Sequence, residues 1–262
     1  MTLSNIKNYT RNAYFFFREV VKMKAFRWEE YKNFFQITIF KYLVMWFSVV
    51  PVIAVIFEQI PSPIEVKLGA NSFVVFLKLP FNWQILWISS FFFVIALIIY
   101  FILCPKFIKK YNTFKDYQSY SHDARWMAWE ASILWKNASV PQKDKLISRL
   151  KKKKFIKKTQ KNENEIYSSD PSVEQNQTVF YFTHQNNSYK LAMPVFDDNG
   201  DVIEDSEKGV FYELFGRYSE SSAFGRGFIL LLLCLSGIAF LSVLGQHIWS
   251  GASFVWQWIM SI

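Results

Sequence analysis

Cysteine and histidine are scarce in this sequence of 262 residues, and the motifs of familiar enzymes are missing from it. The two cysteines, Cys104 and Cys234, lie in apolar runs, so we expect small apolar side chains and no disulfide framework. No HExxH, CxxC or His-x-His spacing occurs, and neither a GxxxxGKS/T nor a GxSxG motif is present. We therefore expect no metal site, no cofactor, no catalytic residue and no enzymatic activity.

The three histidines give few candidates for chemistry. His122, Asp123 and Glu130 are the best residues for the enzyme alternative, although His122 and Glu130 are eight residues apart, two turns along a helix. We expect His184 to be an exposed polar residue. His247 lies near the outer end of an apolar run, where an interfacial role competes with a pore- or proton-related one.

Charge is missing from Leu79 to Pro105, a stretch of 27 residues, and Ile85 to Cys104 is almost wholly apolar. A hydrocarbon core about 30 Å thick needs roughly 20 apolar residues of helix. Because backbone groups in lipid must satisfy their own hydrogen bonds, the stretch predicts a membrane-spanning helix. With the run before it, it forms a predicted transmembrane hairpin over residues 39–105.

Two further apolar runs predict a first and a third span. The first, Ile39 to Phe57, contains Pro51, which predicts a kink; a gating hinge is the alternative. The third, Gly227 to Trp249, opens a region without formal side-chain charge that continues to the end of the chain. We expect residues 227–262 to form a span and an external aromatic tail in the outer headgroup layer.

Positive charge flanks the predicted hairpin and sets its orientation. Residues 1–41 carry eight Lys/Arg against three Glu, and residues 106–161 carry sixteen Lys/Arg against four acids. The positive-inside rule then places the N-terminus and residues 106–226 in the cytoplasm, and the C-terminus outside. Arg217 and Arg226, just before the third apolar run, are expected to mark its start in the cytoplasm. Residues 1–38 interleave basic and aromatic residues at helical spacing, which is typical of an amphipathic helix in the headgroup layer. Packing of that helix on the cytosolic domain is the alternative.

Residues 106–226 predict a small cytosolic α+β domain, whose helical part comes first. Ser121 to Asn137 reads as a helix with a broad apolar surface, and Pro141 to Lys158 reads as a second, basic helix. The basic run predicts binding of acidic lipid, nucleic acid or an acidic partner; a solvated helix end is the alternative. The candidate binding residues are Arg125, stacked on Trp129, with Trp126, Lys151, Lys152, Lys153, Lys154, Lys157 and Lys158.

The second part of this domain predicts strands. Residues 178–183 and 189–196 alternate as two strands after a polar linker over 159–176. Asp197 to Asp201 reads as a tight turn rather than a calcium loop, because the glycine and the closing glutamate of such a loop are misplaced. Residues 210–215 fit either a strand or a helix start. The fold class expected is an α-helical membrane protein with three transmembrane helices and a small α+β domain.

The arrangement of hairpin, basic helical segment, small sheet and C-terminal span resembles the small transmembrane effectors of bacterial antiviral systems, such as the retron-associated membrane proteins. The resemblance is architectural and covers the chain in outline. It implies a toxin-like effector of the bacterial inner membrane with a periplasmic C-terminus. A cytosolic protein or nucleoprotein complex would hold this effector inactive, and release would let it oligomerise or rearrange and permeabilise the bilayer.

The alternative function is an interaction subunit that docks a soluble complex to the membrane. The charge distribution motivates a partner in either case, because residues 162–215 carry eleven acids and two lysines, the reverse of residues 106–161. Binding through the lysine run would be electrostatic and would weaken with salt.

Overall fold

The computed structural model describes residues 26–60, 64–68, 71–75, 81–159, 170–197, 199–203 and 205–260, without the side chains of 38–40, 43, 58, 64–68 and 71–75. The chain divides into two compact units. The helical unit comprises Met1–Phe26, Glu30–Leu103 and Ser222–Ile262, and the mixed unit comprises Arg27–Glu29 and Cys104–Ser221. Most of the helix expected over residues 1–38 lies outside the described residues, and its last part is the helix α2, Trp28–Gln36.

Two helices of the helical unit are long and apolar enough to cross a membrane. They are α4 (Trp83–Leu103) and α11 (Ala223–Met260). The predicted first span is α3 (Thr38–Gln59), a continuous helix through Pro51 whose apolar run, Val44–Phe57, is shorter. Membrane-crossing length is thus found for two of the three expected spans.

The segment between α3 and α4 contains a two-stranded hairpin. Strand β1 (Ile64–Leu68) pairs antiparallel with β2 (Asn71–Val75). The β-prone residues of this segment begin at Ser72, within β2.

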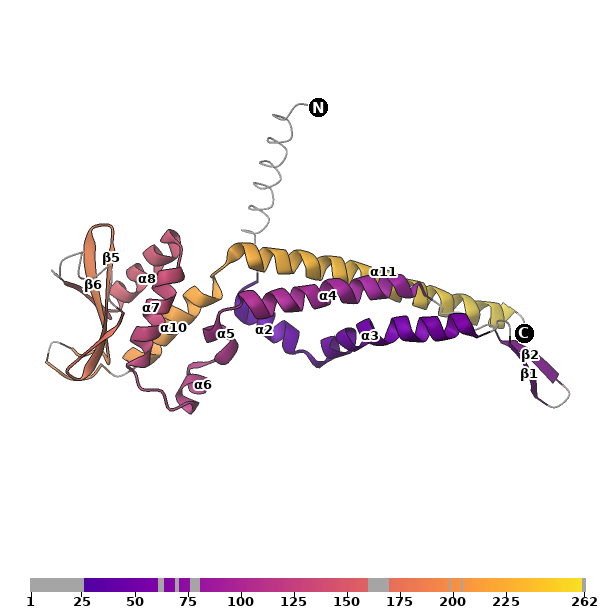
Figure 1. Cartoon of the computed structure of the whole chain (residues 1–262), viewed down its shortest axis with the longest axis horizontal. Helices are drawn as coiled ribbons and strands as arrows, with labels where there is room; N and C mark the ends of the chain where they lie inside the picture. Colours follow the sequence, from indigo (N-terminus) through magenta and orange to yellow (C-terminus); the bar gives the residue numbers. More distant parts are fainter. Residues whose placement is uncertain are drawn as a thin grey trace, which may run out of the picture. The chain divides into compact units, whose positions relative to one another are not determined.

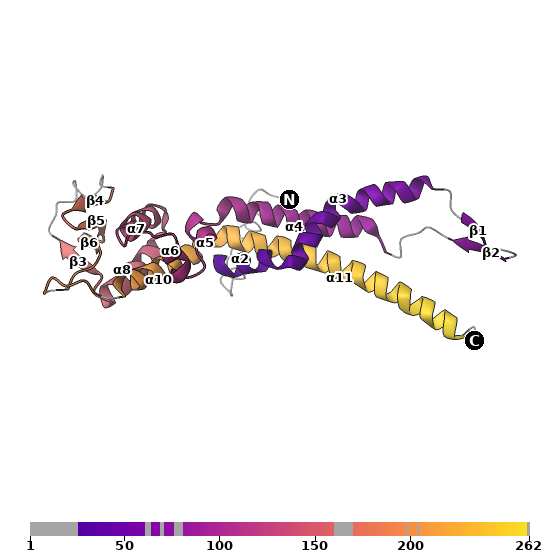
Figure 2. The ribbon, with the colours of Figure 1, turned by 90° about the horizontal axis from the view of Figure 1, so that it is seen from below.

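Helices α4 and α11 run side by side and antiparallel in both ribbon views (Figures 1 and 2). Ser89 lies opposite Ser236 near the middle of the pair, and the backbone N–H of Asn82 donates to Gln246 Oε1 at 2.9 Å at the end where α4 begins. This register leaves the last 14 residues of α11, His247 to Met260, beyond the start of α4. The predicted third span, Gly227 to Trp249, is therefore only part of one helix that also includes the expected external tail.

Aromatic stacking attaches α3 to α4. The ring of Phe47 stacks on Trp87 with centroids 5.5 Å apart and an interplanar angle of 20°. One turn further along α3, Val50 is buried in a small cluster with Leu86 of α4 and Val243 of α11. The residues around Pro51 are therefore the part of α3 that contacts both long helices.

The mixed unit combines short helices with one antiparallel sheet. Its described strands are ordered β3-β6-β5-β4. Strands β4, β5 and β6 follow one another as antiparallel neighbours, and β3 pairs with the last of them, β6. Its elements are α5 (Lys106–Lys110), α6 (Phe114–Ser119), α7 (Trp126–Asn137), α8 (Val140–Lys152), β3 (Ile156–Thr159), β4 (Ser172–Glu174), β5 (Gln177–His184), β6 (Asn187–Met193) and α10 (Ser206–Ser219).

The core of the mixed unit is rich in aromatic rings. Phe211 of α10 is fully buried, and its ring contacts Phe107 at 5.3 Å, Phe114 at 5.5 Å and Tyr117 at 5.6 Å between centroids. On the sheet, Phe182 of β5 meets Trp135 of α7 at 4.6 Å. The sheet thus packs against helix α7 through one apolar face.

The structure corrects the expected helix boundaries. The first helix starts at Trp126 rather than Ser121, because Ser121 has a positive φ of 53° and Asp123 Oδ1 accepts the Arg125 N–H in a turn. The second helix ends at Lys152 rather than Lys158, and strand β3 follows it. The uncertain residues 210–215 are helical in α10.

A Schellman motif explains why the second helix stops within a run of lysines. The N–H of Phe155 donates to the carbonyl of Leu150 at 2.9 Å, and the N–H of Lys154 to that of Lys151 at 3.0 Å. Lys154 takes the left-handed conformation, with φ of 59°, at a position that glycine usually fills. The helix end is therefore invisible to a search for glycine.

The two predicted strands of the sheet are confirmed as β5 and β6. Their loop is Gln185 and Asn186, both with positive φ, as a two-residue hairpin requires. Two stretches of the expected polar linker are strands: Thr159 closes β3, and Ser172–Glu174 is β4. The turn at Asp197 is also present, closed by the bridge between Phe196 and Val202.

Candidate functional site

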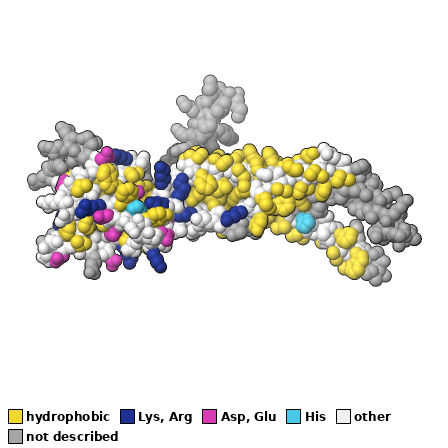
Figure 3. All heavy atoms as spheres, turned by 60° about the horizontal axis from the view of Figure 1, so that its bottom comes forward, with side chains coloured by type: hydrophobic (Ala, Val, Ile, Leu, Met, Phe, Trp, Pro, Cys, Tyr) yellow, Lys and Arg dark blue, Asp and Glu magenta, His cyan; other side chains and the backbone are white. Residues whose placement is uncertain are grey.

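Large apolar side chains cover the outward faces of the helical unit. Ile102 of α4 is 73% exposed, and Ile238 and Leu241 of α11 are 64% and 63% exposed. In the space-filling view these helices show a nearly continuous hydrophobic surface (Figure 3). Exposed apolar patches on soluble proteins rarely exceed a few hundred Å², so a surface of this kind is typical of contact with a membrane or with another protein.

The buried seam between α4 and α11 carries polar groups. Ser89 Oγ donates to the carbonyl of Ser236 at 2.8 Å, and Ser236 Oγ donates to the carbonyl of Ser89 at 2.9 Å. Both serines are buried, as is Ser90 beside them. Small hydrogen-bonding residues at helix contacts are typical of helix association in membranes, where apolar packing alone gives little preference.

Gly225 allows close contact between the same two helices near the other end. A Cβ atom at this position would lie 2.6 Å from Leu103 Cδ1, a distance that real contacts do not reach. Any larger residue at this position would force the Leu103 side chain to move where the first turn of α11 meets the last turn of α4.

The proposed gating residues occupy different places in the helical unit. Pro51 lies inside α3, next to the buried Val50. His247 is exposed at the outer end, where its ring meets Phe81 edge to face at 6.2 Å. Cys234 is also exposed on α11, contrary to the expectation that both cysteines are buried; Cys104 is buried.

Arg226, expected to mark the cytoplasmic start of the third span, is a buried side chain. Its Nη1 donates to the carbonyl of Phe26 at 2.9 Å, and its own carbonyl accepts from Tyr31 Oη at 2.7 Å. Arg226 thus attaches the beginning of α11 to α2 rather than standing free before the membrane. Arg217, assigned the same role, is buried in α10 with a bidentate contact to Glu220.

The lysine run does not form one basic helix face. Lys151 and Lys152 are the last residues of α8, and Lys153 and Lys154 form the helix end. Lys157 and Lys158 are neighbours on strand β3 and therefore face opposite sides of the sheet. A single lysine patch, as the sequence predicts, is thus divided among three structural settings.

Part of the basic segment is neutralised within the chain. Lys153 Nζ lies 2.9 Å from Glu213 Oε1, and Arg149 lies 3.8 Å from the same buried carboxylate on α10. Lys136 pairs with Asp170, so a second acid from the acidic segment meets the basic one. Residues of the basic segment 106–161 and of the acidic segment 162–215 therefore form ion pairs with each other. These pairs weaken the argument that the charge of either segment requires an external partner.

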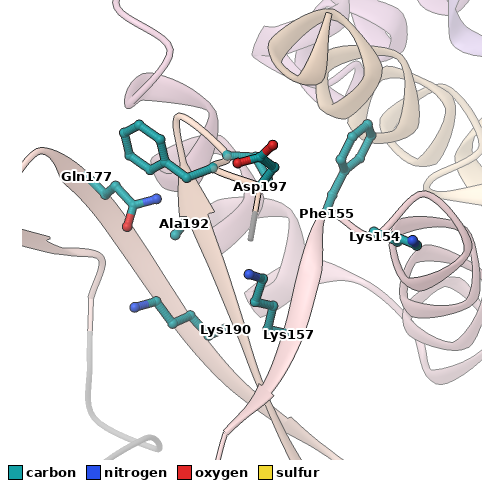
Figure 4. A pocket seen from close by; sticks show the side chains of 9 residues that line it. Lys154, Phe155, Lys157, Gln177, Lys190, Ala192 and Asp197 are labelled. Atoms are coloured by element: carbon teal, nitrogen blue, oxygen red, sulfur yellow. The ribbon is translucent and has the colours of Figure 1, made fainter. Parts of the chain in front are cut away.

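A lysine-lined cleft of the mixed unit is bordered by the segment that follows α8, by strands β3, β5 and β6, and by the chain after β6. It encloses about 190 Å³ and is lined by Lys154, Phe155, Lys157, Gln177, Lys190, Ala192, Val195, Phe196 and Asp197. In the close-up the Lys157 and Lys190 side chains reach into the space from neighbouring strands, and Gln177 reaches in from β5 (Figure 4). This cleft joins two predicted residues, Lys154 and Lys157, to residues that sequence reasoning missed.

Lys190 is the most informative of the missed residues. It is one of two lysines in the acidic segment 162–215, which is the signal in the sequence that sets it apart. Its Cα pairs directly with that of Lys157 across β3 and β6. That pairing was hidden because residues 141–158 read as one helix.

The candidate residues of α7 have structural partners. Arg125 lies 3.3 Å from the carbonyl of Asn176 and 3.9 Å from Asp123, and in the described chain no cation–π contact joins it to Trp129. Trp126 stacks on His122 at 5.3 Å and 6° between ring planes. Both tryptophans remain partly exposed, at 44% for Trp126 and 40% for Trp129.

His122 is enclosed by aromatic and basic groups rather than by acids. Its Nε2 lies 2.9 Å from Tyr111 Oη and 3.1 Å from Lys110 Nζ. Burial, followed by the nearby Lys110 charge, lowers the pKa of His122 below 6.5. The folded chain then binds fewer protons than the unfolded one, so this contribution to stability is lost as the pH falls below about 6.5 toward the lowered pKa.

Glu130 and Glu207 are carboxyl groups held near tyrosines in the core. Tyr218 Oη donates to Glu130 Oε2 at 3.3 Å and to the Glu130 carbonyl at 3.0 Å. Burial raises the pKa of Glu130, and burial likewise raises the pKa of Glu207. Because the folded state then holds extra protons, their contribution to stability falls as the pH rises from about 4.5 through the raised pKa.

His184 is mostly buried rather than exposed as expected. Its Nε2 contacts Asp144 Oδ1 of α8, and its ring lies edge to face with Trp135. These two contacts join the end of β5 to helices α8 and α7. Within the described ranges, no group of three or more His, Cys, Asp or Glu side chains is placed to hold a metal ion.

Comparison of the chain with protein-family models, with curated proteins and with solved structures finds no match.

Proposed function

We propose that this chain is a multi-pass protein of the bacterial inner membrane that anchors a folded cytosolic domain to the bilayer. The observation that carries the proposal is the inverted polarity of the helical unit. Its α4–α11 seam holds the reciprocal Ser89–Ser236 hydrogen bonds, while Ile102, Ile238 and Leu241 face outward. That arrangement is favourable in hydrocarbon and unfavourable in water.

In this proposal α3 crosses the membrane as well. It is 22 residues long, and at 1.5 Å per residue it reaches roughly 33 Å, about the thickness of a hydrocarbon core. Lys41 near its start extends toward the cytoplasmic headgroups along its apolar stem. The N-terminus and the mixed unit are then cytoplasmic, and the β1–β2 hairpin and the C-terminus are external, as the positive flanks require.

The mixed unit acts as the interaction module. Its core is built from its own residues, such as Phe107, Phe211 and Leu214, and it presents a charged surface and a basic cleft. Because its basic and acidic segments pair internally, it needs no partner to neutralise them. Docking of a soluble protein or nucleoprotein complex to the membrane is the function that this division supports best.

Cysteine labelling in spheroplasts tests the topology. In a background of Cys104→Ala and Cys234→Ala, a membrane-impermeant maleimide should label Met260→Cys in intact spheroplasts and Lys152→Cys only after lysis. Both side chains are exposed, so the reagent reaches either one when it is on the same side of the membrane. Labelling of Lys152→Cys in intact spheroplasts would overturn the proposed orientation.

A second candidate function is a membrane-permeabilising effector, held inactive by a partner and active as an oligomer. The length of α11 favours it. The 14 residues from His247 to Met260 add apolar surface that an anchor does not need, including Trp249 at 76% and Phe254 at 72% exposed.

Controlled expression with a membrane-potential dye separates the two functions. The effector should depolarise cells as the full chain, and a truncation after His247 should not, although it keeps the α4–α11 seam. Pro51→Ala and His247→Gln then test gating, since each changes the current or the dye response if the residue moves during opening. An unchanged potential with the full chain, with and without the trigger, rejects the effector.

A further inference from the structure

The side of α11 that packs on α4 repeats at intervals of three and four residues. From Ile229 onward its residues, all buried apart from a half-buried alanine, are Ile229, Leu232, Ser236, Ala239 and Val243. Ser236 meets Ser89 of α4, and Val243 clusters with Leu86 of the same helix. Alternating steps of three and four residues are the pattern of a helix that packs along one seam against a neighbouring helix. The seam with α4 therefore follows a seven-residue repeat.

The same repeat continues beyond the start of α4. Its next four positions carry hydrogen-bonding side chains, which we call the outer stripe: Gln246, Ser250, Ser253 and Gln257. Gln246 is level with the start of α4, where its Oε1 accepts the Asn82 N–H. The three residues after it therefore extend the seam into a part of α11 that α4 does not reach. Figure 2 shows these last turns of α11 apart from α3 and α4.

The outer stripe is polar on a stretch of helix that is otherwise largely apolar. Trp249, Phe254 and Trp256 beside it are exposed. Among the described residues, the side chains of the outer stripe beyond Gln246 form no hydrogen bond. Hydroxyl and amide groups left unpaired in an apolar setting cost free energy, whereas at helix contacts in membranes the same groups bond across the interface. The outer stripe therefore fits a neighbouring helix with matching hydrogen-bonding groups better than it fits acyl chains.

We propose that two copies of this chain associate in the membrane through the outer stripe, with their α11 helices parallel. A second copy is the partner because serine hydroxyls and glutamine amides both donate and accept hydrogen bonds, so the stripe is complementary to itself. Two copies inserted in the same direction are related by a twofold axis, which places each stripe residue opposite its own counterpart. The inference rests on the proposed membrane setting and applies to either candidate function.

Helix α4 limits the extent of this contact. It covers the same side of α11 from Ile229 to Val243, so the two α11 helices can meet only from Gln246 onward. Residues 246–257 give a contact roughly 18 Å long at 1.5 Å per residue. The two copies should therefore be close together along the outer stripe and apart along the α4 seam, although both lie on one side of the helix.

Disulfide cross-linking in native membranes tests this pattern. In a full-length chain without its own two cysteines, Ser253→Cys and Gln257→Cys should form disulfide-linked dimers on mild oxidation. Val255→Cys is exposed on the opposite side of the helix and should give severalfold less dimer. Ala239→Cys lies on the same side of α11 as the stripe but against α4, so it should give little dimer as well.

Energy transfer between labelled copies in phosphatidylethanolamine–phosphatidylglycerol liposomes measures the association itself. Gln257→Leu should raise the dimer dissociation constant by about threefold, the effect of losing one hydrogen bond between membrane helices. Adding Ser253→Ala should raise it by about tenfold in total. Val255→Leu should leave it unchanged, because that side chain points away from the stripe.

Three results would overturn the proposal. Equal dimer yields from Ser253→Cys and Val255→Cys would mean random collision. No dimer, together with labelling of both stripe variants by a membrane-impermeant maleimide in intact spheroplasts, would mean that the stripe faces water on the bilayer surface. A mixed disulfide with a different protein in place of the dimer would mean that another helix occupies the stripe.

These outcomes are distinct from a failure of the proposed function. Release of the chain by alkaline extraction would refute the membrane setting and this inference with it. Labelling of Lys152→Cys in intact spheroplasts would refute the orientation alone, because two copies inserted the other way round still run parallel. A chain that stays in the membrane and forms no dimer through the stripe would refute this inference alone.

Discussion

The helical and mixed units place their polar groups in opposite locations. In the helical unit the hydrogen-bonding side chains Ser89 and Ser236 are inside and the outward faces of α4 and α11 are apolar. In the mixed unit the interior is aromatic around Phe211, and exposed ion pairs such as that of Lys136 with Asp170 lie on its surface. The same chain therefore follows two sets of rules, as expected if the helical unit lies in the proposed bilayer.

The largest effect is expected from the aromatic core of the mixed unit. Phe211→Ala should cost about 3–5 kcal/mol of unfolding free energy, because the residue is fully buried among rings. Phe224→Ala, on the exposed start of α11, should change stability by less than about 0.5 kcal/mol. Urea unfolding in detergent, followed by limited proteolysis, measures both. Equal costs would mean that the two units do not differ in what they bury.

A lipid-facing charge tests the other side of the comparison. Ile238→Lys places a charge on the exposed face of α11 near its paired centre, and should cost about 2.5–3.5 kcal/mol of insertion free energy. Tyr212→Lys, at a comparably open position of the mixed unit, should stay within about 0.5 kcal/mol. Alkaline extraction of membranes measures insertion. Full retention of Ile238→Lys would show that this face lies in water.

The end of helix α8 gives a smaller effect of opposite sign. Lys154→Gly should stabilise the mixed unit by about 1 kcal/mol, because glycine adopts the left-handed conformation without the Cβ clash. Lys154→Ala removes the same charge but retains the strain, so it should give no such gain. Lys152→Gly, inside the last helical turn, should instead cost about 1 kcal/mol. Thermal unfolding of the three variants shows whether backbone or charge decides.

The smallest effect is expected at the serine seam. Ser89→Ala should weaken the contact of α4 with α11 by about 0.6 kcal/mol, the usual size of such bonds in membranes. A double-mutant cycle with Ser236→Ala should show coupling between the two positions. Ser242→Ala, whose hydroxyl bonds only to Ile238 of its own helix, should not alter that contact. Absence of coupling would mean that apolar packing alone holds the helices together.

Sequence patterns predicted the parts of this molecule that depend on nearby residues. The uncharged run before Pro105 became α4, and the alternating residues around Phe180 and Leu191 became β5 and β6. Hydrophobic period and turn residues are local, so they can be read along the chain. The strand β3 was missed because its pairing with β6 is a contact between distant segments.

The site was predictable only in part for the same reason. The lysine run drew attention to Lys154 and Lys157, but Lys190 joins them through the strand register. Lys153 belongs to the same run and is instead paired with the buried Glu213, a contact that the run itself does not encode. Lysines of one run, such as Lys153, Lys154 and Lys157, thus have different surroundings, because the helix end and the strand turn their side chains in different directions.

In the proposed membrane setting, the length of α11 has a consequence for the surrounding bilayer. Its last 14 residues extend roughly 21 Å past the start of α4, and simple tilting is limited because α11 packs along the shorter helix. Such hydrophobic mismatch is relieved where the acyl chains are long and is penalised where they are short. The fraction of the protein that stays inserted in the membrane should therefore increase with acyl-chain length, and the length of α11 would make insertion sensitive to membrane thickness.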